Sequence, residues 1–365
     1  MAGASVHGMK GDQIERAAAA RARRRAAQRA ARVAEGAAEL DRRLADALRR
    51  GLAGGGPPWA ELAARMVDAQ APGLAARARA LAEPGAGDSG PGALSRLLEE
   101  CALLHLLAAG YGRVEALPAP LAATVRARVG FTAEAAAILA TGPRVRDTWR
   151  VLGRREGVEE RLSARRVWLR GASSGQQALL LGFTGPAGST AAAATPSPAS
   201  GPVDGLRAGA ALDAELAYYP GALPLRAVLD PAGACPAGDG PAGDGPAGGS
   251  PAAAPEGCSL AEGVARYGSG LAADPWLESW PVVLAGAIPV PGPGSGGRGW
   301  RLADAATGES VPFDPRHAVA SGLWRLAAVS GGRPLTVFGE LGHRGFAAVT
   351  AWPPEDPGAP VDVTD

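Results

Sequence analysis

Hydrophobic residues recur every three or four positions in the first part of the chain, but gather in short runs or alternate in the later part. Residues 14–52 contain no proline and are rich in Ala, Arg, Leu and Glu, which favours one long helix. A second helix is predicted over residues 59–70 and continues over 74–81 after an interruption at Pro72-Gly73, and a third and a fourth are predicted over 94–107 and 121–139. The third is apolar on nearly every side and is expected at the centre of a bundle. The long helix carries an apolar face: Val33, Ala37, Leu40, Leu44 and Leu48.

Beyond residue 144 the hydrophobic period shortens toward two, which indicates strands. Ser259 precedes a helical spacing over residues 259–271, which predicts one further helix with a serine cap. Glycine-rich turns separate the last three runs and predict an antiparallel meander or small barrel. The predicted strands are residues 145–152, 165–170, 178–183, 212–219, 225–229, 281–290, 300–303, 323–329, 335–341 and 346–352. We therefore expect an α+β protein, with about four amino-terminal helices followed by a β-rich, mainly antiparallel half.

Shifts in composition suggest how the chain is divided. Pro-Ala-Gly-Asp-Gly occurs from Pro236 and again from Pro241, in a tract that lacks the apolar residues needed for a core. The predicted parts are a flexible start (1–20), a helical domain led by an Arg-rich helix (21–143), a β-rich domain (144–352) with low-complexity loops at 185–201 and 231–257, and a frayed tail (353–365).

Composition weakens several familiar sequence signals. The 365 residues include 37 basic and 36 acidic side chains, but Lys10 is the single lysine and asparagine is absent. This bias is typical of a GC-rich genome, so arginine runs and glycine clusters carry less information than usual. The three cysteines are odd in number and far apart, which favours the reducing cytoplasm. No secretory signal or membrane-spanning run is recognised, so no membrane association is expected.

Three short motifs match patterns found at chemical sites. The Gly-x-Ser-x-Gly pattern around Ser173 fits a hydrolase nucleophile elbow, but the strand predicted after it favours a hairpin loop. Residues 292–297 contain Gly-x-Gly-x-x-Gly, yet no helix is predicted after them to receive a dinucleotide. Cys101 and His105 share a helical face, which suits either a zinc site or an ordinary core pair. We predict no catalytic residue, no metal ligand and no resident cofactor.

A basic segment in the first helix is the remaining candidate. Through residue 34 there are eight basic and two acidic residues, a net charge of +6. Steps of four, four and three place part of this set in one stripe that could follow phosphates, although a solvated face of an Arg-rich helix is the favoured explanation. No aromatic residue is interleaved to stack on bases. The candidate nucleic-acid-binding residues are Arg21, Arg23, Arg24, Arg25, Arg29 and Arg32.

Longer sequence segments carry more information about family membership than these short motifs. The segments in question are RMVDAQAPGLAARARAL (65–81), LLEECALLHLL (97–107), TGPRVRDTWRVLGRRE (141–156), RRVWLRG (165–171), DPWLESWPVVLA (274–285) and LWRLAAVSGGRPLTVFGE (323–340). In this order they resemble the region downstream of the zinc finger in actinobacterial SWIM zinc finger proteins. The likeness covers residues 21–352.

The resemblance implies kinship with finger proteins that bind DNA or protein, but the finger itself is absent. A SWIM finger consists of Cys-x-Cys followed by Cys-x-His, and neither pattern occurs here. Zinc is therefore expected only if a finger is supplied upstream or by another chain.

The most consistent prediction is a non-enzymatic interaction or scaffold module that works with a SWIM-type protein and a protein partner. The alternative is nucleic-acid binding through the Arg-rich helix, and a hydrolase using Ser173 ranks third. The apolar face of the first helix would also suit a coiled-coil arm.

Overall fold

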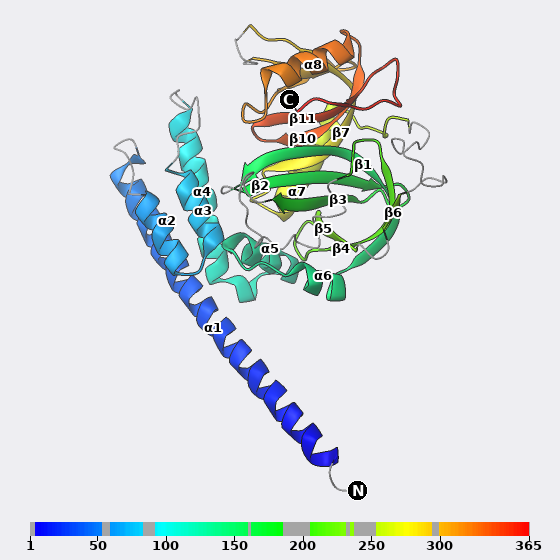
Figure 1. Cartoon of the computed structure of the whole chain (residues 1–365). Coiled ribbons are helices and arrows are strands. Elements are labelled where there is room, and N and C mark those ends of the chain that lie inside the picture. The colour runs from blue at the N-terminus through cyan, green and yellow to red at the C-terminus, as the bar shows by residue number, and fades with distance from the viewer. Residues whose placement is uncertain are drawn as a thin grey trace. The chain divides into compact units, whose positions relative to one another are not determined.

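The computed structural model describes residues 4–52, 59–82, 92–159, 162–184, 205–230, 234–236, 253–293 and 299–364. They belong to two compact units, Met1–Thr132 and Ala133–Asp365. Figure 1 shows helices throughout the first unit and mainly strands in the second. The predicted fold class, a helical amino-terminal half followed by a β-rich, mainly antiparallel half, is confirmed.

The described part of the first unit consists of helices. Its elements are α1 (Ala4–Arg50), α2 (Trp59–Asp68), α3 (Pro72–Ala80), α4 (Ala93–Gly112), the 3-10 turn η2 (Val114–Ala116) and α5 (Ala119–Val129). The predicted apolar face of α1 is buried against the other helices from Val33 to Leu44, whereas Leu48 is 42% exposed. Helix α1 begins at Ala4, where the sequence predicts a flexible start over residues 1–20 and a helix from residue 14.

Two predictions about the helices are wrong. Helix α4 does not occupy the centre of a bundle, because Leu94 and Leu98 are 53% and 50% exposed while its opposite face is buried. The helix predicted over residues 121–139 is broken at Gly130, whose φ of +123° lies in a region that favours glycine. Its second part is α6 (Ala135–Thr141), which belongs to the second unit and not, as predicted, to a helical domain ending at residue 143.

The second unit begins with a closed barrel. Its strands are β1 (Arg144–Glu159), β2 (Leu162–Gly171), β3 (Gln177–Thr184), β4 (Ala211–Tyr218) and β5 (Arg226–Leu229), and β6 (Cys235–Pro236) joins the edge of β4. The order is β1-β2-β3-β5-β4, closed by β1 pairing with β4. Only the β3–β5 pair is parallel among these described pairings. A five-stranded Greek-key barrel of this topology has the arrangement of the OB class.

Strand β1 is long and bends, so that its two halves pair with different strands. Its first half pairs with β4 and its second half with β2, with a bulge between Val151 and Gly153. Inside the barrel, the indole of Trp149 donates a hydrogen bond to the carbonyl oxygen of Ala214 at 3.0 Å. Ile138 of α6 packs against Ala217 and Val228 at one end of the barrel. Helix α6 is thus part of this unit's core.

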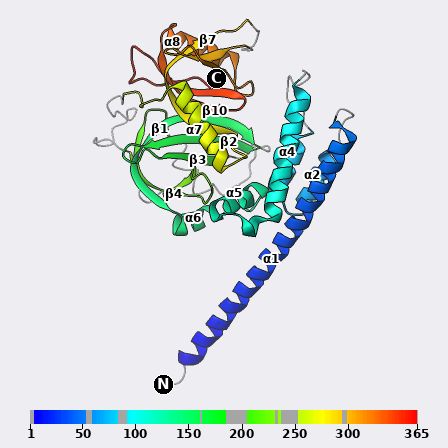
Figure 2. The same cartoon turned by 180° about the vertical axis from the view of Figure 1, so that it is seen from behind.

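A separate sheet of six strands follows the barrel, in the order β12-β11-β10-β7-β8-β9. We refer to it as the second sheet. Its elements are α7 (Leu260–Ala273), β7 (Ser279–Val290), β8 (Arg301–Asp304), β9 (Ser310–Pro312), α8 (Ala320–Ser330), β10 (Leu335–Gly342), β11 (Gly345–Trp352) and β12 (Val361–Asp362). Leu260 of α7 and Leu323 of α8 share one core with the apolar face of this sheet. Figure 2 shows the unit from the side on which α7 is seen in front.

Two further predictions in this part are corrected. Residues 323–329 form helix α8 instead of a strand, since Leu323 and Leu326 lie on one buried face while Trp324 is 61% exposed. The expected turn at Gly331 is a left-handed helix cap, with φ of +54°. The tail is not frayed through residue 364, because β12 pairs with β11 and Val363 is buried. The low-complexity loop at 185–201 and most of 231–257 lie outside the described residues.

The barrel and the second sheet pack against each other face to face. Leu152 and Trp168 from the barrel form one buried cluster with Val283, Phe338 and Trp352 from the sheet. This close approach requires Gly153, because a Cβ at that position would lie 2.6 Å from Cγ1 of Val349 on β11. The second unit therefore has three layers, in which the barrel covers one face of the sheet and α7 and α8 cover the other.

Candidate functional site

The Arg-rich part of α1 extends beyond the buried face of that helix. Every residue from Arg16 to Gln28 is exposed, and we refer to residues 16–28 as the basic arm. The arm contains five arginines, no acidic residue and no apolar side chain larger than alanine. Figure 1 shows α1 continuing as one helix past α2. At about 1.5 Å per residue, the arm is about 20 Å long.

The predicted arginine stripe is divided by the fold into two parts. Arg29 and Arg32 contact the helical unit at the root of the basic arm. The remaining four make no side-chain hydrogen bond or ion pair with any residue that the structure describes: Arg21, Arg23, Arg24 and Arg25. The structure thus assigns a structural role to two of the six candidates and leaves four as an exposed cationic set.

Arg29 anchors α1 to the end of α5. Its Nη2 donates to the carbonyl oxygen of Gly130 at 2.9 Å, and its guanidinium lies 4.5 Å above the ring of Phe131. Phe131 in turn stacks on Tyr111 with 5.8 Å between the ring centroids. A cation is favoured there both by the aromatic face and by the carbonyl end of a helix.

Arg32 makes a second anchor at the end of α2. Its Nη2 donates to Oε1 of Gln70 at 2.7 Å. Gln70 has a φ of +60°, in the turn that ends α2. Neither Gln70 nor Phe131 was singled out from the sequence, because both contacts join residues far apart in the chain.

The coiled-coil interpretation of α1 loses its main support. A coiled coil needs apolar residues at the heptad positions that face the partner helix. The apolar face of α1 is already covered by the other helices of the first unit, at Val33, Leu40 and Leu44. The basic arm offers alanine in place of such residues. The exposed chemistry of the arm is therefore its positive charge.

The Gly-x-Ser-x-Gly loop around Ser173 is organised by a buried aspartate. Oδ1 of Asp147 accepts the N–H of Ser173 at 3.1 Å, and Oδ2 accepts the N–H and the hydroxyl of Ser174 at 2.8 and 2.7 Å. Burial raises the pKa of Asp147, but these hydrogen bonds outweigh it and the net pKa is lowered. The loop joins strands β2 and β3, so it lacks the strand-turn-helix geometry of a nucleophile elbow.

Cys101 and His105 have different surroundings in the folded chain and do not form a joint site. Burial raises the pKa of the Cys101 thiol to about 11, which keeps it protonated at neutral pH. Nδ1 of His105 instead pairs with a carboxylate oxygen of Asp41. Cys258 is buried and Cys235 exposed. Within the described residues, no group of three or more His, Cys, Asp or Glu side chains is placed to hold a metal ion.

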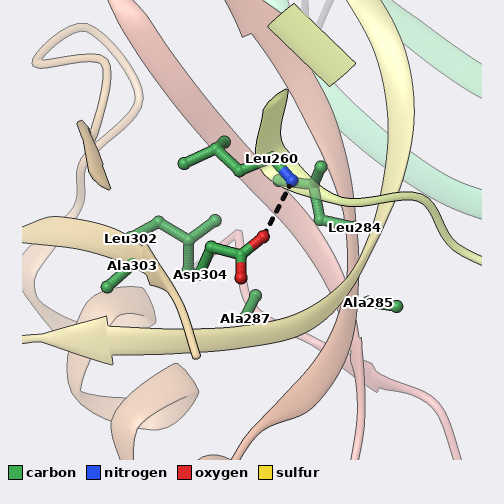
Figure 3. A pocket seen from close by; sticks show the side chains of 7 residues that line it. All are labelled: Leu260, Leu284, Ala285, Ala287, Leu302, Ala303 and Asp304. Atoms are coloured by element: carbon green, nitrogen blue, oxygen red, sulfur yellow. Dashed lines mark hydrogen bonds between the residues drawn. The ribbon is translucent and has the colours of Figure 1, made fainter. Parts of the chain in front are cut away.

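The glycine fingerprint falls largely outside the described part of the chain, which resumes at Gly299. The described residues after it form strand β8, whereas dinucleotide binding requires a helix at that point. A hollow nearby is lined mainly by alanine and leucine (Figure 3). Oδ2 of Asp304 there accepts the N–H of Leu260 at 3.1 Å, at the start of α7. Asp304 therefore caps the start of α7.

The barrel face that serves ligands in OB-class proteins is covered in this chain. Such proteins hold oligonucleotides on the face of their second and third strands. Here Trp168 of β2 and Leu179 of β3 pack against the second sheet, and Nε2 of Gln177 donates to the carbonyl oxygen of Pro281 at 3.0 Å. This leaves the basic arm as the strongest candidate surface among the described residues.

Comparison with protein families found a match within the first unit. Residues 28–129 match the SWIM-associated four-helix bundle domain. This supports the resemblance to the region downstream of a SWIM zinc finger. The matched region starts at Gln28, so the basic arm lies almost entirely ahead of it. No curated protein and no solved structure matched the chain.

Among the residues that the structure describes, no helix is both long enough and apolar enough to cross a bilayer.

Proposed function

We propose that this chain is a non-enzymatic interaction module that works with a SWIM zinc finger protein, and that its basic arm docks a polyanionic partner. The observation that carries the proposal is the exposed composition of the arm: five arginines, no acidic residue and no apolar anchor. Arg29 and Arg32 support it, because they fix the direction in which the arm leaves the helical unit.

The family match supports the association with SWIM proteins, since residues 28–129 resemble a domain found with that finger. In this proposal any zinc belongs to the finger, which another segment or another chain supplies. The module works in the cytoplasm, where its cysteines stay reduced. No residue of the chain is assigned a catalytic role.

The proposal is tested by chromatography of the full chain on immobilised heparin, a generic polyanion. Substitution R24Q/R25Q removes two exposed charges from the arm, and R49Q/R50Q removes two from the opposite end of the same helix. We expect the arm variant to elute at clearly lower salt than the wild type, and the control variant close to it. Equal elution of the two variants would overturn the proposal.

A further inference from the structure

We infer that the polyanion recognised by the basic arm is double-stranded DNA, bound by insertion of the arm into the major groove. The inference rests on the proposed function, because it names the partner of the same surface. It begins from the distribution of side chains around the arm. An α-helix turns by about 100° per residue, so each side chain of residues 16–28 has a defined direction.

The arm has a narrow face of small residues between two cationic flanks. Ala19, Ala22 and Ala26 follow each other at steps of three and four and therefore share one face. Arg25 lies on one side of this alanine face and Arg23 on the other, about 160° apart around the helix. The charges thus point to opposite sides of a backbone that carries no bulky group between them.

This arrangement fits the dimensions of B-form DNA. The major groove is about 12 Å wide and admits an α-helix, with one phosphate backbone on each side. A helix with an alanine face can lie deep in the groove, because methyl groups add little to its width. Arg25 and Arg23 then reach the phosphates on the two walls. Arg21 lies one turn from Arg25 on the same flank and extends that contact along the strand.

A protein partner fits the arm less well. Helices that dock in protein grooves insert apolar anchors at intervals of three or four residues, and interface energy concentrates in such buried side chains. The exposed residues 16–28 contain no apolar side chain beyond alanine. Phosphate contacts need none, since their free energy comes from charge neutralisation and counterion release.

Double-stranded RNA and membranes fit less well too. The major groove of A-form RNA is deep and narrow and does not admit side chains in this way. A helix that lies on a membrane surface has an apolar face with residues such as Leu, Phe or Trp. The arm has an alanine face in that position, so duplex DNA is the polyanion that its geometry favours.

The inference is tested by fluorescence anisotropy with three labelled probes: a DNA duplex of 20 base pairs, an RNA duplex of the same length and poly-L-glutamate. We expect the full chain to bind the DNA duplex about tenfold or more tightly than the other two at equal salt. The logarithm of the DNA affinity falls with the logarithm of salt, with a slope near −3 for the three phosphates that Arg21, Arg23 and Arg25 reach. R24Q/R25Q lowers the magnitude of that slope by about one, because Arg24 points away from the alanine face, and R49Q/R50Q leaves it unchanged.

A second pair of variants separates groove insertion from simple charge attraction. A22L/A26L keeps every charge of the arm but places two large side chains on its alanine face. We expect it to weaken DNA binding about tenfold while retention on heparin is unchanged. A17L/A27L adds the same bulk away from that face and serves as its control. Circular dichroism verifies that all variants stay helical.

The outcomes discriminate between the two proposals. The DNA inference is overturned if the chain binds DNA and polyglutamate with equal affinity, or if it prefers RNA. The docking function still stands in either case, provided that binding to heparin depends on the arm. An unaltered DNA affinity of A22L/A26L also overturns groove insertion. Failure to bind any polyanion overturns both.

Discussion

Arg155 on β1 and Glu340 on β10 form an ion pair between the barrel and the second sheet, with 2.6 Å between Nη1 and Oε2. Their side chains are only 11% and 7% exposed. Nη2 of Arg155 also donates to the carbonyl oxygens of Ala347 and Ala348, both at 3.2 Å. Burial lowers the pKa of Arg155, and the charge of Glu340 opposes that shift. The guanidinium thus crosses the interface with its donors largely satisfied.

Removing one member of this pair should strongly destabilise the second unit. R155M removes the nearer cation from the buried Glu340 carboxylate and leaves only Nη1 of Arg166, 4.0 Å from Oε1, so we expect the free energy of unfolding to fall by about 3 kcal/mol. The double variant R155M/E340L should recover much of this loss, because no unpaired charge remains. Urea unfolding followed by tryptophan fluorescence measures both.

The control for this prediction is R146Q, which breaks a pair with Asp213 whose side chains are 60% and 46% exposed. An exposed pair of this kind contributes about 1 kcal/mol or less. If R155M cost no more than R146Q, the ion pair between the two sheets would have no special role in stability.

The root of the basic arm should respond to mutation quite differently from the arm itself. R29Q removes both the hydrogen bond to Gly130 and the cation from the face of Phe131, and should destabilise the first unit by about 1–2 kcal/mol. R25Q removes the same charge one turn earlier and should leave stability within about 0.5 kcal/mol. Thermal unfolding monitored by circular dichroism at 222 nm compares them. Equal melting curves for the two variants would refute the anchoring role of Arg29.

Parts of the fold that depend on neighbouring residues could be predicted from the sequence, whereas parts that depend on packing could not. Helix α7 was predicted from Ser259 because its cap is local: the hydroxyl accepts the N–H of Glu262, and the N–H of Ser259 donates to the Glu262 carboxylate. Helix α8 was mistaken for a strand because a short apolar run suits either structure. Its helical face, with Leu323 and Leu326 inward, is decided by the sheet that it covers.

Contacts between distant segments account for most of what sequence reasoning missed. Closure of the barrel depends on β1 pairing with β4 after more than 60 intervening residues, and no local signal encodes that register. The six candidate arginines were recognised from composition and spacing. Their division into anchors and exposed cations required Gly130 and Gln70, which approach α1 only in the folded unit.

Acid should weaken the hydrogen-bonded loop around Asp147. The pKa of this aspartate is lowered in the folded chain, so its ionised form stabilises the fold above the unfolded pKa, near pH 4, and this contribution disappears as the pH falls further. D147N should lower the free energy of unfolding by about 1–3 kcal/mol at pH 7, and the gap to wild type should shrink below pH 4. Urea unfolding between pH 3 and pH 7 measures this gap.

The two serines of that loop provide a matched comparison. S174A removes the hydroxyl that donates to Asp147, whereas S173A leaves intact the backbone N–H by which Ser173 contacts the same carboxylate. We expect S174A to cost about 1 kcal/mol and S173A to be close to neutral. A pH-independent difference between D147N and wild type would contradict the assigned role of the carboxylate.

The three cysteines should differ sharply in reactivity toward Ellman's reagent. Cys235 is exposed, whereas Cys101 and Cys258 are buried and burial raises the pKa of both thiols, that of Cys101 to about 11. Because the thiolate is the reacting species, we expect one thiol of the native chain to react rapidly at pH 8, and all three in guanidinium chloride. C235S should abolish the rapid phase without changing the reaction of the unfolded chain. A rapid phase that remains in C235S would mean that a buried thiol is reached by local opening of the core, and would contradict the protection assigned to Cys101 and Cys258.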